Sequence, residues 1–367
     1  MITSNMKLMS PVQIGAIGAV NRVFMAPLTR CRATPSTDAP NRLIAQYYAQ
    51  RASAGLIVSE ATQVLPSGKG YMGTPGIYSL EQEQGWAMAT RAVHEAGGKI
   101  IAQLWHVGAI SHPDLQPNGE LPVTASTGFN PGGTVYTPSG KMQQVAARGL
   151  DIHEVKAIVA AFKHSAEVAL RAGFDGVEIH SANGYLLEQF IRNSSNQRTD
   201  EYGGSVENRL RFTLQIVDAC IAVWGAQRVG IRLSPVSRAN NSLPDGNAQE
   251  TYGTLVNELA SRAIAFVHFI EGNTGGAREL DGFDFLAARK VLQAKQVAYI
   301  ANNKYTREMA NQALDKDAAD AIAFGVPFIA NPDLPKRLAL NAPLNPPITR
   351  TFYSAGEVGY TDYPFLA

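Results

Sequence analysis

The sequence predicts a single (β/α)8 barrel, in which eight parallel strands close into a cylinder covered by helices. Short apolar runs alternate with longer amphipathic stretches, and there are eight such runs. The runs are continuously apolar rather than alternating, as strands buried on both faces are. A doubly wound open sheet would need a glycine-rich turn after its first strand. The stretch TRCRATPST, which follows the first run, contains no glycine and therefore favours the barrel.

The predicted strands are the eight apolar runs, and each is followed by a segment with room for a covering helix. In order, the strands are RVFMAPL (22–28), LIVSEA (56–61), KIIAQLWH (99–106), GVEIH (176–180), VGIRLSP (229–235), FVHFIEG (266–272), VAYIANN (297–303) and AIAFGV (321–326). The expected helices are 41–53, 81–96, 152–171, 205–224, 249–263, 283–294 and 305–315. The 3.6-residue period is clearest in 152–171, where apolar residues from Val155 to Ala169 gather on one face.

One domain over residues 1–367 accommodates all of these elements. Residues 107–149 interrupt the pattern, because they are rich in Pro, Gly, Ser and Thr and have no helical period. They fall between the third strand and the third helix, at the end of a barrel where active sites lie. Long loops in compact domains are commonly functional. We therefore expect this insertion to form a cap, with a short hairpin, beside the mouth of a pocket.

Composition excludes several classes of protein. The 367 residues carry a formal net charge of +1 and no basic run, which argues against a nucleic-acid partner. No stretch approaches the length of a membrane span, and the N-terminus MITSNMKLMSPV lacks the apolar core of a signal peptide. Two cysteines are too few for a disulfide scaffold or a cysteine-based metal site. These features predict a cytoplasmic protein without nucleic-acid or membrane partners and without a metal.

Two polar residues stand inside otherwise apolar strands. Gln103 lies between Ala102 and Leu104, and Arg232 lies between Ile231 and Leu233. An unpaired polar group buried there would cost about 1–3 kcal/mol or more, so each needs a partner. An internal ion pair of Arg232 with Glu60 or Glu178 is one reading. A polar ligand at the barrel mouth is the other, and flavin mononucleotide (FMN) offers a pyrimidine edge for such residues and a phosphate for the strand 7–8 loops.

The stretch HSANGY places three hydrogen-bonding side chains at the junction of a strand and a helical pattern. These are His180, Asn183 and Tyr185, with Gly184 available for the turn. A lone histidine is more often structural than catalytic. Three such groups at one strand end predict a site.

Several long motifs resemble the Old Yellow Enzyme family, in particular its bacterial N-ethylmaleimide, pentaerythritol tetranitrate and xenobiotic reductases. The resemblance covers nearly the whole chain. Its motifs are APLTRCRA (26–33), SEATQVLPSGKGYMGTPGIYS (59–79), AQLWHVG (102–108), GFDGVEIHSANGYLLEQFIRNSSNQRTDEYGGSVENRLRF (173–212), GIRLSP (230–235), AFGVPFIANPDLPKRL (323–338) and EVGYTDYP (357–364).

The resemblance implies an FMN-dependent ene reductase. Such an enzyme takes electrons from NADPH or NADH and reduces the C=C bond of α,β-unsaturated carbonyl or nitro compounds in a ping-pong cycle, with hydride leaving flavin N5. Nitroesters and nitroaromatics are further implied substrates. The partner is thus a small electrophilic alkene, and the protein a monomer or homodimer.

The same resemblance assigns roles to residues at matched positions. His180 and Asn183 would hold the substrate oxygen, Tyr185 would donate the proton, and Tyr71 and Trp105 would shape the pocket. Thr29 would donate to flavin O4. Non-covalent FMN would be held by Pro27, Leu28, Thr29, Ala61, Gln103, Arg232, Asn303, Lys304, Gly325 and Val326.

The chain departs from the family pattern where FMN phosphate is expected. The family usually has Gly-Arg after strand 8, whereas this chain has Gly325-Val326, and Asn302-Asn303 replaces a glycine-rich turn after strand 7. We hypothesise that Lys304 replaces the missing arginine.

Two other functions remain open. One is a metal-dependent barrel hydrolase, which would use His106, His180 and His268. The other is a flavin-binding protein without catalytic activity, which the altered phosphate site would suit.

Overall fold

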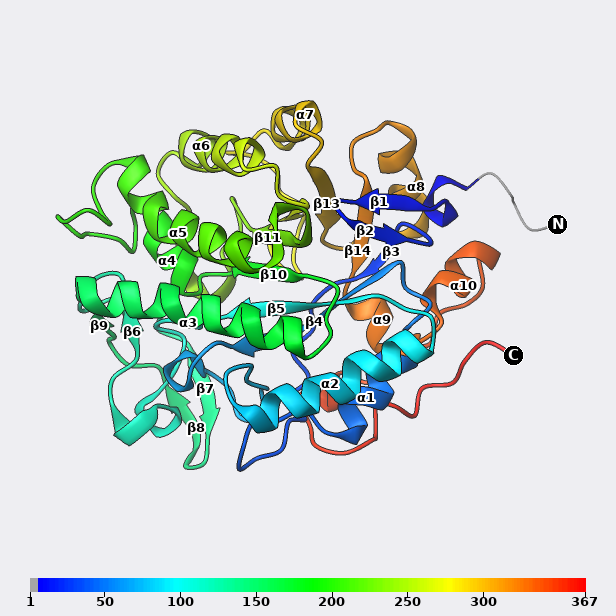
Figure 1. Ribbon diagram of the computed structural model, residues 1–367, viewed down its shortest axis with the longest axis horizontal. Helices are drawn as coiled ribbons and strands as arrows, with labels where there is room; N and C mark the ends of the chain where they lie inside the picture. Colours follow the sequence, from blue (N-terminus) through cyan, green and yellow to red (C-terminus); the bar gives the residue numbers. More distant parts are fainter. Residues whose placement is uncertain (1–5) are drawn as a thin grey trace.

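The computed structural model describes residues 6–367 and confirms the (β/α)8 barrel (Figure 1). Eight parallel strands close on themselves, with β14 pairing β3 and β5 pairing β10. In chain order they are β3 (Val23–Met25), β4 (Leu56–Gln63), β5 (Ile100–Trp105), β10 (Val177–Ser181), β11 (Val229–Leu233), β12 (Phe266–Ile270), β13 (Ala298–Asn302) and β14 (Ala321–Phe324). Every predicted strand is present. The first ends earlier than predicted, at Met25, because Pro27 lacks the N–H that a ladder needs.

Helices cover the outside of the barrel, and all seven predicted ones are present. Capping boxes fix the starts of two of them: Ser79 with Gln82, and Asp151 with Glu154. Three further short helices, α4, α9 and α10, were not among the predicted set. The ten are α1 (Arg42–Ala49), α2 (Leu80–Glu95), α3 (Ile152–Arg171), α4 (Leu186–Ile191), α5 (Val206–Trp224), α6 (Ala248–Ser261), α7 (Phe285–Ala294), α8 (Arg307–Asp315), α9 (Val326–Ala330) and α10 (Leu334–Leu340).

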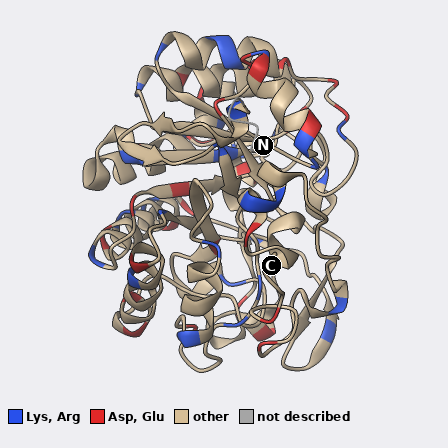
Figure 2. Cartoon of the chain, turned by 90° about the vertical axis from the view of Figure 1, so that its right-hand side faces the viewer, with Lys and Arg blue, Asp and Glu red and all other residues tan. Residues whose placement is uncertain are grey.

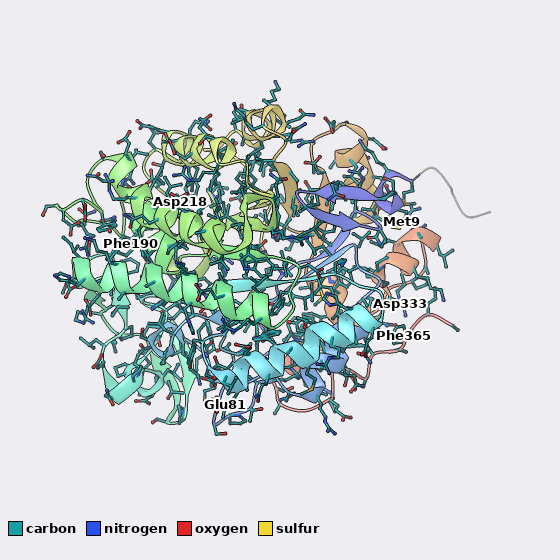
Figure 3. All side chains as sticks on the ribbon, in the orientation of Figure 1. Met9, Glu81, Phe190, Asp218, Asp333 and Phe365 are labelled. Carbon is teal, nitrogen blue, oxygen red and sulfur yellow. The ribbon has the colours of Figure 1, made fainter. Side chains whose placement is uncertain are left out.

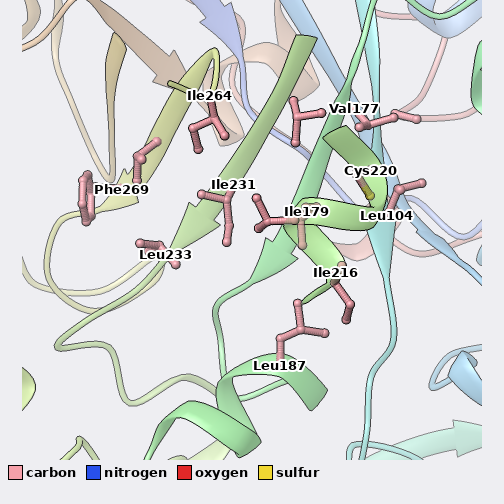
Figure 4. Close-up of a cluster of buried hydrophobic side chains, with 14 of the residues drawn as sticks. Leu104, Val177, Ile179, Leu187, Ile216, Cys220, Ile231, Leu233, Ile264 and Phe269 are labelled. Carbon is pink, nitrogen blue, oxygen red and sulfur yellow. The ribbon is translucent and has the colours of Figure 1, made fainter. Parts of the chain in front are cut away.

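The main core lies between the barrel and the helices (Figure 4). Ile179 pairs in register with Leu104 on one side and Ile231 on the other, so these apolar side chains form a row on the outer face. Ile216 and Cys220 of α5 belong to the same buried cluster. Because side chains alternate along a strand, the residues between them point into the barrel.

The barrel interior is apolar at one end and polar at the other. At the amino ends of the strands, β1 (Val12–Ile14) and β2 (Ile17–Ala19) form an antiparallel hairpin whose isoleucines pack on Phe24 and Phe266. Gly15 at its turn has φ +55°, and a Cβ there would lie 2.3 Å from the Gln227 carbonyl oxygen. The sequence did not reveal this hairpin, because three-residue strands are too short to show a period.

The insertion at 107–149 contains two small sheets. β6 (Val123–Thr124) pairs in parallel with β9 (Arg148–Gly149), and β7 (Thr134–Thr137) pairs antiparallel with β8 (Gly140–Gln143). The β7–β8 hairpin lies beside the barrel, at the lower left of Figure 1.

Charged residues are dispersed over the outside of the molecule. Lysines and arginines are scattered among acidic residues in the view of Figure 2, with no large patch of one sign among the described residues. Figure 3 labels Glu81 and Asp218, which lie on the exposed sides of α2 and α5. Among the described residues, no helix has both the length and the hydropathy that crossing a membrane requires.

Candidate active site

The turn after β10 carries the three side chains that the sequence singled out. Asn183 and Gly184 both have left-handed backbone conformations, with φ of 61° and 74°. The Asn183 N–H donates to Ser234 Oγ at 2.8 Å, and the Gly184 N–H donates to Glu188 Oε2 at 2.5 Å. Both acceptors are fully buried. The turn is therefore held by side chains of β11's end and of α4, which fixes where Asn183 and Tyr185 stand.

Aromatic rings surround Tyr185. Trp105, which ends β5, lies edge-on to Tyr185 at 4.9 Å between ring centroids and stacks on Tyr71 at 5.8 Å. The His180 ring is edge-on to Tyr185 at 5.1 Å. The hydroxyls of Tyr71 and Tyr185 lie 3.1 Å apart. The structure thus brings together four of the five residues predicted to hold substrate or supply a proton, and Asn183 lies two residues before Tyr185.

Burial sets the protonation of these groups. Desolvation raises the pKa of Tyr185 and raises that of Tyr71 well above its usual value, so both are phenols at neutral pH. Burial, with the nearby charge of Arg232, lowers the pKa of His180 well below its usual value, so its imidazole is neutral. Burial also lowers the pKa of Arg232 to about 10, and the guanidinium stays charged. The site therefore offers neutral donors beside one fixed cation.

A buried polar layer lies beneath these groups. Gln103 Nε2 donates to Glu178 Oε1 at 2.7 Å, and His268 Nδ1 lies 2.8 Å from Glu178 Oε2. Arg232 donates to Asn302 Oδ1 at 2.8 Å and forms no ion pair with Glu60 or Glu178. The internal ion pair considered for Arg232 is therefore wrong, because Glu178 is already occupied by Gln103 and His268.

Two adjoining cavities open at this end of the barrel. The first, of about 720 Å³, is lined by Tyr71, Asn183, Tyr185 and the β7–β8 hairpin. The second, of about 500 Å³, is lined by eight of the ten predicted cofactor residues: Pro27, Leu28, Thr29, Arg232, Asn303, Lys304, Gly325 and Val326. The other two, Ala61 and Gln103, pair in register on β4 and β5 and are buried. Both cavities share Thr29, Asn183, Thr274 and Tyr353, so they form one continuous cleft.

The turn after β13 closes the far end of the second cavity. Asn303 and Lys304 have φ of 112° and 51°. The Asn303 side chain donates to the carbonyls of Glu271 and Asn273, and Arg278 donates to the Asn303 carbonyl. Lys304 is exposed, as is Val326. Lys304 is thus the cation that stands directly on this turn.

Sequence reasoning missed several residues that line the cleft, including three polar side chains near Asn183 and Tyr185. Thr274 follows β12, Asn240 lies in the loop after β11, and Tyr353 comes from the C-terminal segment. Loops carry no period, and their one usable signal is position just after a barrel strand. That signal was available for Thr274 and not for Tyr353.

The site does not resemble a metal centre. His268 is committed to Glu178, and residues 6–367 contain no group of three or more His, Cys, Asp or Glu side chains placed to hold a metal ion.

Comparison with known proteins identifies the family. The model of the NADH:flavin oxidoreductase / NADH oxidase family matches residues 7–345. The chain belongs to this family, that of the Old Yellow Enzymes. The expected resemblance is confirmed, and the protein is a flavin oxidoreductase.

Relatives and solved structures agree with this assignment over almost the full length. The chain is 42% identical to putative 12-oxophytodienoate reductase 5 of rice, over 96% of this chain and 92% of the relative. Morphinone reductase is 44% identical, with a TM-score of 0.93 and coverage of 99% and 97%. The Old Yellow Enzyme homologue of Zymomonas mobilis is 42% identical, with a TM-score of 0.92 and coverage of 98% and 99%.

Proposed function

We propose that this flavin oxidoreductase reduces the C=C bond of α,β-unsaturated carbonyl or nitro compounds with electrons from NADPH or NADH. The observation that carries the proposal is the end of β10 and its turn, where Asn183 and the Tyr185 phenol line one cleft with Arg232 and the His180 ring lies edge-on to Tyr185. The relatives support the substrate class, because they include 12-oxophytodienoate and morphinone reductases.

The residues of the second cavity fit FMN. Arg232 is buried and charged, yet its Nε has no hydrogen-bond partner among the described residues. A ligand acceptor would satisfy it. Gln103 gives its amide nitrogen to Glu178, which leaves its oxygen as an acceptor for a ring N–H. We assign the flavin ring to Pro27, Leu28, Thr29, Ala61, Gln103 and Arg232. When bound, FMN supplies the two-electron chemistry that side chains lack.

The phosphate would lie on the turn after β13, near Asn303, Lys304, Gly325 and Val326. Two observations support Lys304 as its cation. Its left-handed backbone places it at the cavity wall, and its ammonium makes no hydrogen bond or ion pair within residues 6–367. Phosphate would therefore meet a free charge there rather than a competing carboxylate.

His180 and Asn183 would bind the oxygen of the substrate. As the β-carbon is reduced, negative charge develops on that oxygen, and donors aimed at it in a buried site lower the barrier. His180 is neutral, and its Nδ1 has no partner within the described residues. A neutral imidazole still has one N–H to donate.

Tyr185 would supply the proton to the α-carbon. Burial keeps its phenol protonated, and the hydroxyl of Tyr71, 3.1 Å away, could return a proton to it. Trp105 and Tyr71 would shape the space for the substrate.

Anaerobic half-reactions test the proposal. NADPH or NADH should bleach the yellow flavin, and 2-cyclohexenone should restore its colour. In the Tyr185→Phe variant, the flavin should still bleach at the rate of the parent. Its reoxidation by 2-cyclohexenone should slow by about 10²-fold or more, because the general acid is lost. Bleaching without reoxidation by any activated alkene would refute alkene reduction. A protein that never bleaches would instead be a flavin store.

A further inference from the structure

We propose that Thr274 is a positioning residue that holds the side-chain amide of Asn183 with its nitrogen facing the substrate. This inference rests on the proposed function, in which Asn183 donates to the substrate oxygen. Thr274 lies in the loop between β12 and α7 and lines both cavities of the cleft. Its Oγ1 lies 2.6 Å from Asn183 Oδ1.

The backbone of Asn183 is fixed independently of Thr274. Its N–H donates to Ser234 Oγ, and its carbonyl oxygen accepts from Asn240 Nδ2 at 2.9 Å. These two contacts hold the peptide groups before and after the Asn183 Cα, so the side-chain torsions are the remaining freedom. The orientation of the amide therefore depends on what its oxygen and nitrogen meet.

The direction of the hydrogen bond follows from Ser237. Its Oγ accepts the backbone N–H groups of Ala239 at 3.2 Å and of Thr274 at 3.3 Å. A hydroxyl has two lone pairs and one hydrogen, so both lone pairs are occupied. Its hydrogen is then available only for Thr274 Oγ1, which lies 3.1 Å away. Ser237 is therefore the donor in that pair.

Thr274 passes this direction on to Asn183. With Ser237 donating to it, the Thr274 hydroxyl keeps its own hydrogen, which it donates to Asn183 Oδ1 at 2.6 Å. Asn183 Nδ2 makes no hydrogen bond within residues 6–367, and both of its hydrogens are available to the cleft. The chain Ser237–Thr274–Asn183 thus selects the orientation that a substrate oxygen requires.

Loss of this chain would free the amide to flip. In the flipped orientation, the Asn183 oxygen would face the substrate oxygen, and two acceptors would meet. Thr274→Val keeps the size of the side chain and removes the hydroxyl. One hydrogen bond of about 1.4 kcal/mol corresponds to a tenfold change in rate or affinity.

The experiment measures reoxidation of the reduced enzyme by 2-cyclohexenone. We expect Thr274→Val to lower the second-order rate constant about tenfold, while the FMN content and melting temperature stay those of the parent. Thr274→Ser, which restores the hydroxyl, should recover the rate to within about twofold. Thr254→Val makes the same chemical change in α6, remote from the cleft, and should leave the rate unchanged. The proposal would be overturned if Thr274→Val had the rate constant of the parent, or if Thr274→Ser were as slow as Thr274→Val.

A double-mutant cycle separates positioning from a general structural effect. In an Asn183→Ala background, Thr274→Val should not lower the rate constant further, because the amide that Thr274 positions is absent. A full tenfold loss in that background would mean that Thr274 acts elsewhere.

Ligand binding distinguishes failure of this inference from failure of the proposed function. Cyclohexanone has the carbonyl oxygen of 2-cyclohexenone but no C=C bond, so its binding can be measured without a redox reaction. Thr274→Val should weaken its binding about tenfold, as seen in the flavin absorbance. If the parent fails to reduce 2-cyclohexenone yet this weakening is observed, the proposed function fails and the positioning role stands. Equal binding by the parent and the variant refutes the positioning role.

Discussion

Glu188→Gln should destabilise the protein strongly, although it changes one atom and almost no volume. Glu188 is fully buried in α4. Its Oε1 accepts from Ser234 at 2.7 Å, Tyr252 at 2.8 Å and Arg192 at 2.9 Å. Its Oε2 accepts from the Gly184 N–H. Four donors converge on this carboxylate.

The size of the effect follows from these contacts. An amide has one oxygen and one NH₂ group. In either orientation of the substituted side chain, the NH₂ group would therefore point at hydrogen-bond donors of the surrounding protein. If NH₂ replaces Oε1, it meets three donors, and if it replaces Oε2, it meets the Gly184 N–H. Removing one charge of a buried ion pair costs about 3–5 kcal/mol. We expect the free energy of unfolding to fall by about 3 kcal/mol, the lower end of this range. The reason is that Arg192 also donates to three backbone carbonyls and keeps those hydrogen bonds.

Urea unfolding followed by circular dichroism, with equal saturating FMN, measures this difference. Glu201→Gln is the matched control, because Glu201 is half exposed and its nearest cation, Lys156, is 3.9 Å away. The control should change the free energy of unfolding by less than about 0.5 kcal/mol. The turn carrying Asn183 and Tyr185 should also loosen, so reoxidation by 2-cyclohexenone should slow under conditions where Glu188→Gln remains folded. If the two variants unfold at the same urea concentration, the reasoning from converging donors is wrong.

Three further predictions concern the cofactor, pH and packing. Lys304→Ala should weaken FMN binding and Val326→Arg should tighten it, each by about tenfold or more in a flavin fluorescence titration. If Lys304→Ala binds FMN with the affinity of the parent, Lys304 does not bind the phosphate. Burial raises the pKa of Glu60 from 4.5 to about 7, so its protonated form is favoured in the folded state. The resulting contribution to the free energy of unfolding, on the order of 3 kcal/mol, is fully present below pH 4.5 and is lost as pH rises to 7. Glu60→Gln should abolish this loss of stability, as measured by urea unfolding at several pH values. Gly230→Ala should lower the melting temperature, because its Cβ would lie 2.1–2.3 Å from the Phe266 ring, an overpacking that costs about 1–3 kcal/mol; an unchanged melting temperature would mean that the ring moves freely.

The fold could be predicted because its signals are local. Each strand of a parallel barrel is buried on both faces and therefore appears as an unbroken apolar run. Gln103 and Arg232 were conspicuous because they interrupt such runs, and His180, Asn183 and Tyr185 because they lie together at one strand end. Both local patterns pointed to the barrel mouth, where Asn183, Tyr185 and Arg232 line the cleft and Gln103 and His180 are buried.

The partners of these residues could not be predicted, because they come from elements far apart in the chain. Glu178 binds Gln103 and His268, 75 and 90 residues away, and so leaves Arg232 to Asn302. Nothing in the sequence shows that Arg232 pairs with neither Glu178 nor Glu60, because strand register decides which side chains meet.

The sequence by itself determined which segments form the eight barrel strands and which residue types stand at their ends, since both depend on burial patterns within a few residues. Only the tertiary structure decided which groups of the site are hydrogen-bonded to one another. Thr274 reaches Asn183 across 91 positions of sequence, and its role appears only when Ser237 donates to the Thr274 hydroxyl. A hydrogen bond has a direction that depends on all of its neighbours at once, and those neighbours are brought together by the pairing of β10, β11 and β12.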